Sequence, residues 1–182
     1  GLHDHWYPIL VYAGENTGKP ISRRIHLPDE KTVLQENDII CIDATPIDQT
    51  VWGNWAKTTS IGFDSFYQKL CEDCNTIVAD THAYAQRNAY TIGDIFDHCM
   101  GLIKEAGLVL LDSRKDVGHS IFQVPEGQKV EDTPLEDRLF ISEEYRNTPL
   151  RGIISIEPQV GRVHPSDEKM YGAKQQKVLI ID

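Results

Sequence analysis

The pattern of apolar and polar residues in the first third of the chain predicts two antiparallel strands. One is the apolar run at residues 39–44, which carries Asp43 near its end. The other is the Thr-rich and aromatic run at residues 50–61, which passes Asn54. Asp43 stands among Ile and Cys residues, where a side chain is expected to be buried. A buried carboxylate needs a cation or several hydrogen-bond donors, so another part of the chain must supply them.

Two helices are predicted next. Residues 64–89 form the longer one, and residues 94–105 form a second, which Thr91 or Asp94 caps and Gly107 ends. The apolar residues of the longer helix recur at helical spacing: Phe66, Leu70, Ile77, Val78 and Tyr84. With both helices on one side of a curved antiparallel sheet, the arrangement belongs to the α+β class.

Short apolar runs predict further strands, separated by polar segments. We expect strands at residues 9–13, at 108–111, from Arg151 through Glu157, and at 177–182. Residues 14–18 read as a turn and 19–37 as a surface loop. The acidic segment at residues 126–150 is a long excursion, and such loops are usually functional or mobile. A lid over a pocket and a contact with a partner remain open for it.

Three later stretches could supply the groups that compensate the charge of Asp43. Together with Asp43 and Asn54 they form a series of short motifs in a fixed order along the chain. They are Gly118-His119-Ser120, the Ile-Glu-Pro at Glu157, and the pair Gln175 and Gln176. The series resembles the metallopeptidase family of methionine aminopeptidases, Xaa-Pro aminopeptidases, prolidase and creatinase. The opening HDHWYPILVYAGENTGKP is similar to a bacterial, Xaa-Pro aminopeptidase-like branch of that family.

The resemblance implies the pita-bread fold, a curved antiparallel sheet with covering helices, as one catalytic-type domain over residues 1–182. Compared with the family, the sequence lacks an N-terminal helical segment before the first strand, so either the native protein is longer or that part has been removed. Without those helices we expect an exposed apolar face and pairing with a second copy. The family fold places five ligands, Asp, Asp, His, Glu and Glu, around two divalent metals. Carried over, they give Asp43, His119 and Glu157 as metal ligands, with His119 and Glu157 also catalytic.

Two ligand positions depart from the family pattern. Asn54 stands where the family has its second Asp, and Gln175 where it has its last Glu, or Gln176 if the register shifts by one. Asp43 and Glu157 supply two negative charges, enough for one divalent ion, and neutral amides cannot provide the bridging charge. We therefore expect no dinuclear site, and either no metal or one ion of Mn, Co or Zn.

Simpler interpretations stay open for each of these residues. A lone His between Gly118 and Ser120 is ordinarily a satisfied strand residue, and Glu157 before Pro158 could simply end a strand. Asn54 and Gln175 could be structural polar residues that are hydrogen-bonded to the two carboxylates.

The substrate-binding residues implied by the resemblance are His5 and Glu126. The region of His5 walls the substrate pocket in the family, although a His-x-His pair near a terminus is more often solvated. Glu126 lies where the bacterial branch has it, and no second His follows His119 before residue 137. Arg23 or Arg24 could bind a carboxylate, but a solvated face is the simpler reading.

Composition excludes several classes of function. The chain has 182 residues, 40% of them hydrophobic, and a net charge of −10, so one domain is expected and a nucleic-acid surface is not. No apolar run could span a membrane and no leader opens the chain, which favours a cytoplasmic protein. The lone Cys71-x-x-Cys74 is weak support for zinc, and four reduced thiols are simpler.

We interpret the chain as a Xaa-Pro aminopeptidase-like protein with a degenerate dinuclear site, which lacks standard peptidase activity and keeps a pocket for a small molecule or short peptide. One alternative is an active hydrolase, either with one metal or metal-free like creatinase. In the metal-free case, a pocket with two negative charges would hold a cationic guanidino ligand. Another alternative is a non-catalytic interaction module.

Overall fold

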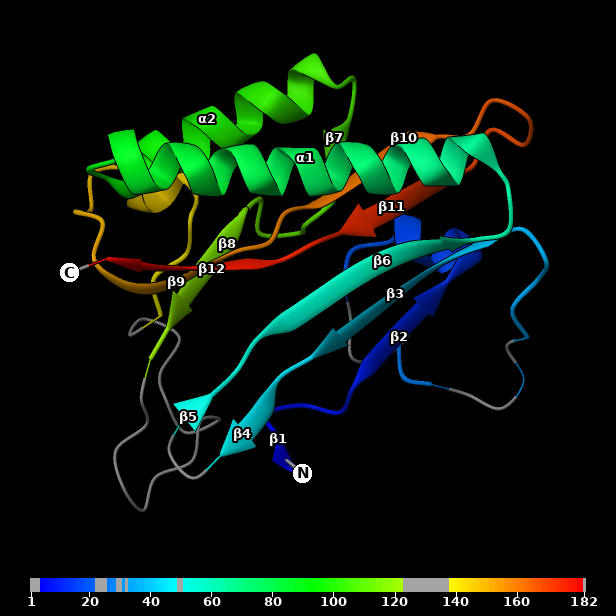
Figure 1. The fold of residues 1–182 in the computed structure, drawn as a ribbon, viewed down its shortest axis with the longest axis horizontal. Helices are drawn as coiled ribbons and strands as arrows, with labels where there is room; N and C mark the ends of the chain where they lie inside the picture. The colour runs from blue at the N-terminus through cyan, green and yellow to red at the C-terminus, as the bar shows by residue number, and fades with distance from the viewer. Residues whose placement is uncertain are drawn as a thin grey trace.

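A computed structural model describes residues 4–21, 26–28, 31, 33–48, 51–122 and 138–181. Figure 1 shows its two long helices side by side over one face of curved antiparallel sheets. This confirms the α+β class. In chain order the elements are β1 (Asp4–His5), β2 (Leu10–Ala13), the 3₁₀ helix η1 (Gly14–Gly18), β3 (Asp38–Ala44), β4 (Pro46–Asp48), β5 (Val51–Trp52), β6 (Trp55–Ile61), α1 (Ser65–Asn88), α2 (Ile92–Glu105), β7 (Val109–Leu110), β8 (Gly118–Ile121), the 3₁₀ helix η4 (Glu143–Tyr145), β9 (Gly152–Ile156), β10 (Gln159–Val163), β11 (Met170–Lys174) and β12 (Lys177–Ile181).

The predicted pair of strands around Asp43 is present as β3 and β6. They pair antiparallel with Asp43 opposite Ala56, and β2 lies on the other side of β3 with Leu10 opposite Asp43. The expected single strand at residues 50–61 is wrong in one respect. Gly53 and Asn54 lie between β5 and β6, and the Gly53 N–H donates to the Pro46 carbonyl oxygen over 2.7 Å. This break places Asn54 at a strand end.

The other strands form three further antiparallel sheets of three strands each. Their orders are β1-β4-β5, β11-β10-β7 and β12-β9-β8. An isolated bridge between Lys57 of β6 and Gln175 joins the Asp43 sheet to the segment that connects β11 with β12. The sequence did not predict the β10–β11 hairpin. This hairpin delivers Lys174, its last residue, to the centre of the fold.

Both helices begin at residues whose side chains cap them. Asp64 accepts hydrogen bonds from the Phe66 and Tyr67 backbone N–H groups at the start of α1. The sequence offered Thr91 or Asp94 as the cap of a helix from Asp94; in the structure α2 begins at Ile92, with Thr91 as its N-cap and Asp94 completing a reciprocal capping box. Apolar side chains of both helices and of the sheets beneath them form one buried cluster, which includes Leu70, Ile77, Ile95, Ile103, Ile154, Val160 and Leu179. This core holds the sheet that carries the polar site.

The described part of the acidic segment packs against the fold. Phe140 forms an isolated bridge with His119, and Pro149 forms one with Thr91 at the start of α2. Arg146 pairs with Asp97 of α2 over 2.8 Å. Residues 138–150 therefore pack against β8 and α2, while 126–137 lie outside the described residues.

All four cysteines are free, and Cys41, Cys74 and Cys99 are buried among apolar side chains. In the ranges that the structure describes, no helix is long and apolar enough to cross a membrane.

Candidate functional site

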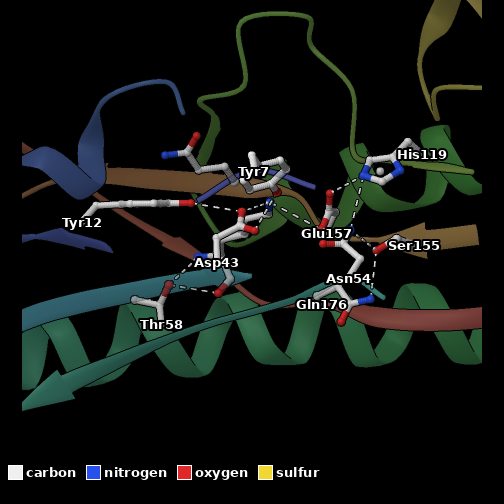
Figure 2. A network of polar contacts seen from close by, with 12 residues as sticks. Tyr7, Tyr12, Asp43, Asn54, Thr58, His119, Ser155, Glu157 and Gln176 are labelled. Carbon is white, nitrogen blue, oxygen red and sulfur yellow. Dashed lines mark hydrogen bonds and ion pairs between the residues drawn. The ribbon is translucent and has the colours of Figure 1, made fainter. Parts of the chain in front are cut away.

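Asp43 lies near the end of β3 with both carboxylate oxygens engaged. Tyr7 Oη donates to Oδ1 over 2.9 Å, and Tyr12 Oη donates to Oδ2 over 3.1 Å. Figure 2 shows both tyrosines directed at this carboxylate. Lys174 Nζ lies 2.7 Å from Oδ2. Asp43 is 1% exposed and Lys174 6% exposed, so this is a buried ion pair.

Lys174 is the cation that the burial of Asp43 required and that the sequence analysis did not identify. Its Nζ also lies 3.4 Å from Glu157 Oε2. The Thr58 hydroxyl on β6 fixes the strand end, since it accepts from the Lys174 backbone N–H and donates to the Lys174 carbonyl oxygen. The ammonium is thereby held between two carboxylates from different sheets.

Glu157 follows β9 and has its own set of donors. His119 Nε2 lies 2.9 Å from Oε1, and Asn54 Nδ2 donates to Oε2 over 2.8 Å. Ser155 Oγ lies 3.2 Å from Asn54 Nδ2 and 3.0 Å from Gln176 Nε2. In Figure 2 these five side chains converge from β8, β9 and the ends of neighbouring strands.

The surroundings of His119 favour its protonated form. Nδ1 lies 2.9 Å from the Ser120 carbonyl oxygen, and Nε2 faces the Glu157 carboxylate. Both of these neighbours are acceptors, and a ring that donates from both nitrogens satisfies them. Asn54 Nδ2 lies farther from Nε2, at 3.3 Å, and donates to Glu157 over the shorter distance of 2.8 Å. Burial opposes a charge on the ring, but Glu157 and the Ser120 carbonyl outweigh it and raise the pKa of His119 above its usual value.

The two carboxylates are therefore compensated. Burial alone would raise the pKa of Glu157, but Lys174 and His119 lower it to about 2. Burial likewise opposes the charge of Lys174, yet Asp43 and Glu157 raise its pKa well above the usual value. Lys174 therefore supplies a positive charge between the two carboxylates, and the raised pKa of His119 favours a second positive charge beside Glu157. The expectation of a pocket with two uncompensated negative charges is wrong, because Lys174 lies between them.

The structure brings together four residues that the sequence analysis selected: Asp43, Asn54, His119 and Glu157. The segment between β11 and β12 contributes Gln176, the alternative position, rather than Gln175, whose side chain instead donates to the Thr58 carbonyl oxygen. Lys174, the last residue of β11, and Gln176, two positions further on, both direct their side chains into the site.

Of the two proposed substrate-binding residues, the structure describes His5, which is not part of this cluster. A cavity of about 170 Å³ adjoins His119, and its wall includes Trp6 and Tyr7 but not their neighbour His5. The predictions for Glu126, Arg23 and Arg24 fall outside the described residues.

Comparison with known proteins decides the family. The model of metallopeptidase family M24 matches residues 1–180. The chain belongs to metallopeptidase family M24. No protein of curated function matches it in sequence.

Solved structures of M24-type enzymes share the fold at low identity. The X-Pro aminopeptidase of Thermotoga maritima superposes with a TM-score of 0.65 at 18% identity, over 100% of this chain and 46% of that chain. The prolidase of Pyrococcus furiosus superposes with a TM-score of 0.67 at 18% identity, over 100% of this chain and 48% of that chain. The methionine aminopeptidase of Thermotoga maritima superposes with a TM-score of 0.67 at 18% identity, over 95% of this chain and 69% of that chain. This chain thus spans less than half the length of the first two. The pita-bread prediction is confirmed.

M24 family members usually bind divalent metals such as Mn, Co or Zn, and the donor set here does not fit such a pair of ions. The oxygens of Asp43 and Glu157 already accept from Tyr7, Tyr12, His119, Asn54 and Lys174. A divalent ion between these carboxylates would have to displace the Lys174 ammonium. Asn54 Oδ1 is buried without a hydrogen-bond partner in the described structure, but one neutral oxygen balances no charge. The described residues contain no cluster of three or more His, Cys, Asp or Glu side chains suited to a metal.

Proposed function

We propose that this M24 domain has replaced the family's metal pair with the ammonium group of Lys174, and that it does not carry out two-metal peptide hydrolysis. It keeps a pocket beside His119 for a small molecule. One observation carries the proposal: Lys174 Nζ lies 2.7 Å from Asp43 and 3.4 Å from Glu157. A fixed cation there supplies the charge balance that ions would otherwise supply.

The polar substitutions around Lys174 support this proposal. Asn54 directs its Nδ2 donor group at Glu157, whereas a carboxylate at this position would repel Glu157. Gln176 likewise donates to Ser155. The two amides therefore hold hydrogen bonds that carboxylates at these positions could not donate.

Metal content and peptidase activity test the proposal together. The purified chain is incubated with Mn²⁺, Co²⁺ or Zn²⁺, desalted, and analysed by mass spectrometry of the metals, and Ala-Pro and Met-Ala hydrolysis is measured with and without chelator. We expect well under one ion per chain and no chelator-sensitive hydrolysis. Two ions per chain, or hydrolysis that chelator abolishes, would overturn the proposal.

A rebuilt variant gives the matched positive control. Asn54→Asp, Gln176→Glu and Lys174→Gln together restore the family's carboxylates and remove the ammonium. We expect this variant to bind Mn²⁺ or Co²⁺ where the parent does not. The variant with only Asn54→Asp and Gln176→Glu keeps Lys174 and should bind more weakly than the triple variant, which isolates the effect of the ammonium.

Metal-free hydrolysis is a second candidate, favoured by the position of His119. Its ring lines the cavity, and Glu157 holds it in place and raises its pKa, which suits a general acid. Turnover of small amides or amidino compounds in the presence of chelator, lost on His119→Gln, would support this candidate. Absence of turnover with binding intact would leave a binding domain.

A further inference from the structure

The cavity beside His119 is small, and its wall combines aromatic rings with polar and charged side chains. Its volume is about 170 Å³, and the rings of Trp6, Tyr7, Trp52 and Phe140 line it. Trp6 and Trp52 meet edge to face with ring centroids 4.6 Å apart, and Trp52 stacks on the His119 ring at 5.7 Å. Pockets for drug-sized ligands are roughly 300–1,000 Å³. This one therefore suits a compact ring or short apolar group rather than a long peptide.

The charged groups on the cavity wall are cationic. Arg114 and Arg138 both line it, with guanidinium carbons 4.9 Å from the Phe140 centroid and 4.3 Å from the Trp6 centroid respectively. The His119 ring lies on the same wall, with its two nitrogens facing Ser120 and Glu157. No Asp or Glu is among the described residues that line the cavity. A cationic guanidino ligand would therefore meet like charges here.

Trp52 supplies a donor that needs an acceptor. Its side chain is 1% exposed, and its indole N–H has no hydrogen-bond partner within the described ranges. An indole nitrogen can only donate, and a buried donor without a partner destabilises the structure. Because Trp52 lines the cavity, an oxygen of a bound molecule could satisfy it.

From this wall we infer that the cavity binds a small carboxylate whose body is a flat or cyclic apolar group. The two carboxylate oxygens match the planar donor fork of an arginine, and the aromatic rings would cover the apolar body. This inference rests on the proposed function only in that an ammonium, rather than metal ions, lies behind His119. It names the chemical class of ligand for that site.

Benzoate and its uncharged analogue benzamide test the inference. Each is titrated into the chelator-treated chain by calorimetry, and binding is mapped by NMR. We expect benzoate to bind with its largest shifts at the Trp6 and Trp52 indole signals, and benzamide to bind at least about tenfold more weakly, because it lacks the charge that pairs with arginine. Equal binding of both, or no binding of benzoate, would overturn the inference. Phosphate that competed as well as benzoate would also overturn it, because it would show a general anion site.

Variants locate the binding site. Arg114→Gln changes an exposed side chain on the cavity wall, and Arg138→Gln changes the second arginine on that wall. Each variant should weaken the binding of benzoate at least about tenfold. Arg87→Gln, an exposed arginine in the last turn of α1, is the matched control and should bind as the parent does. Trp52→Phe keeps the ring but removes the N–H, and should weaken benzoate more than benzamide. If the folded Arg114 and Arg138 variants bind benzoate unchanged, the carboxylate does not bind in this cavity.

The two proposals fail separately. A chain without metal that does not bind benzoate would refute the carboxylate pocket and leave the lysine-filled site intact. A chain with two metal ions would refute the lysine-filled site whatever it binds.

Discussion

Lys174 and Asp43 form an ion pair of 2.7 Å in which both side chains are almost fully buried. Breaking a buried pair by removing one partner usually costs about 3–5 kcal/mol, because the other charge stays buried. We therefore expect Lys174→Gln to lower the free energy of unfolding by about that amount, measured by urea denaturation at pH 7. The exposed Lys177→Gln is the control and should change it by no more than about 0.5 kcal/mol.

A double variant separates this pair from general damage to the core. Asp43→Asn together with Lys174→Gln removes both charges of the pair, so it should be less destabilised than the sum of the two single variants. Additive losses would show that the two groups do not interact, contrary to the structure.

The ion pair between Glu157 and His119 should make the free energy of unfolding depend on pH. The pKa of Glu157 is lowered from 4.5 to about 2, so its contribution, on the order of 3 kcal/mol, is present above pH 4.5 and is lost as the pH falls toward 2. The pKa of His119 is raised, so its contribution is full below its ordinary value of 6.5 and is lost as the pH rises through the folded value. Urea midpoints measured from pH 2 to 9 should pass through a maximum between these limits. In Glu157→Gln the acid limb should flatten, and an unchanged limb would count against the pair.

Asp116 should destabilise the fold at neutral and alkaline pH. Burial, with help from the nearby charge of Asp112, raises its pKa from 3.8 to about 7. A carboxyl whose pKa is raised costs stability as the pH rises above 3.8, and the full cost is reached above 7. Asp116→Asn keeps an oxygen that can accept from the Gly118 N–H. It should raise the melting temperature at pH 8 and change it little at pH 3, whereas a gain of equal size at both values would indicate another cause.

Gly118, which precedes His119, is required by the close approach of β8 to β9. Its φ is +153°, and a Cβ there would collide with the backbone carbonyl oxygen of Ser155. Backbone cannot move aside as a flexible side chain can, so Gly118→Ala should lower stability by more than about 2 kcal/mol. Gly101→Ala is the matched control, since it lies in α2 with nothing near the added methyl group. It should raise stability by up to about 1 kcal/mol, and similar effects at both positions would contradict the packing argument.

Local signals predicted the helices well. The apolar spacing of Leu70, Ile77 and Val78 and the Thr91 and Asp94 cap are properties of adjacent residues, and the structure keeps both. The β10–β11 hairpin was missed because its apolar positions are interrupted by Gly161 and Gly172, which weaken the alternation that marks a strand.

The sequence predicted most of the residues of the site, but it did not predict the cation that balances their charge. The order of motifs along the chain selected Asp43, Asn54, His119 and Glu157, which do converge. Lys174 was overlooked because Asp43 lies 131 residues before it along the chain, and their pairing depends on a hairpin that local patterns did not predict.

The central claim concerns what lies between Asp43 and Glu157, and diffraction from crystals grown with manganese tests it most directly. Anomalous differences near the manganese absorption edge locate Mn independently of the protein density. The account predicts no anomalous peak in the site and density for the Lys174 ammonium in contact with both carboxylates. Two anomalous peaks bound by Asp43, Glu157 and Asn54, with Lys174 turned away, would contradict it.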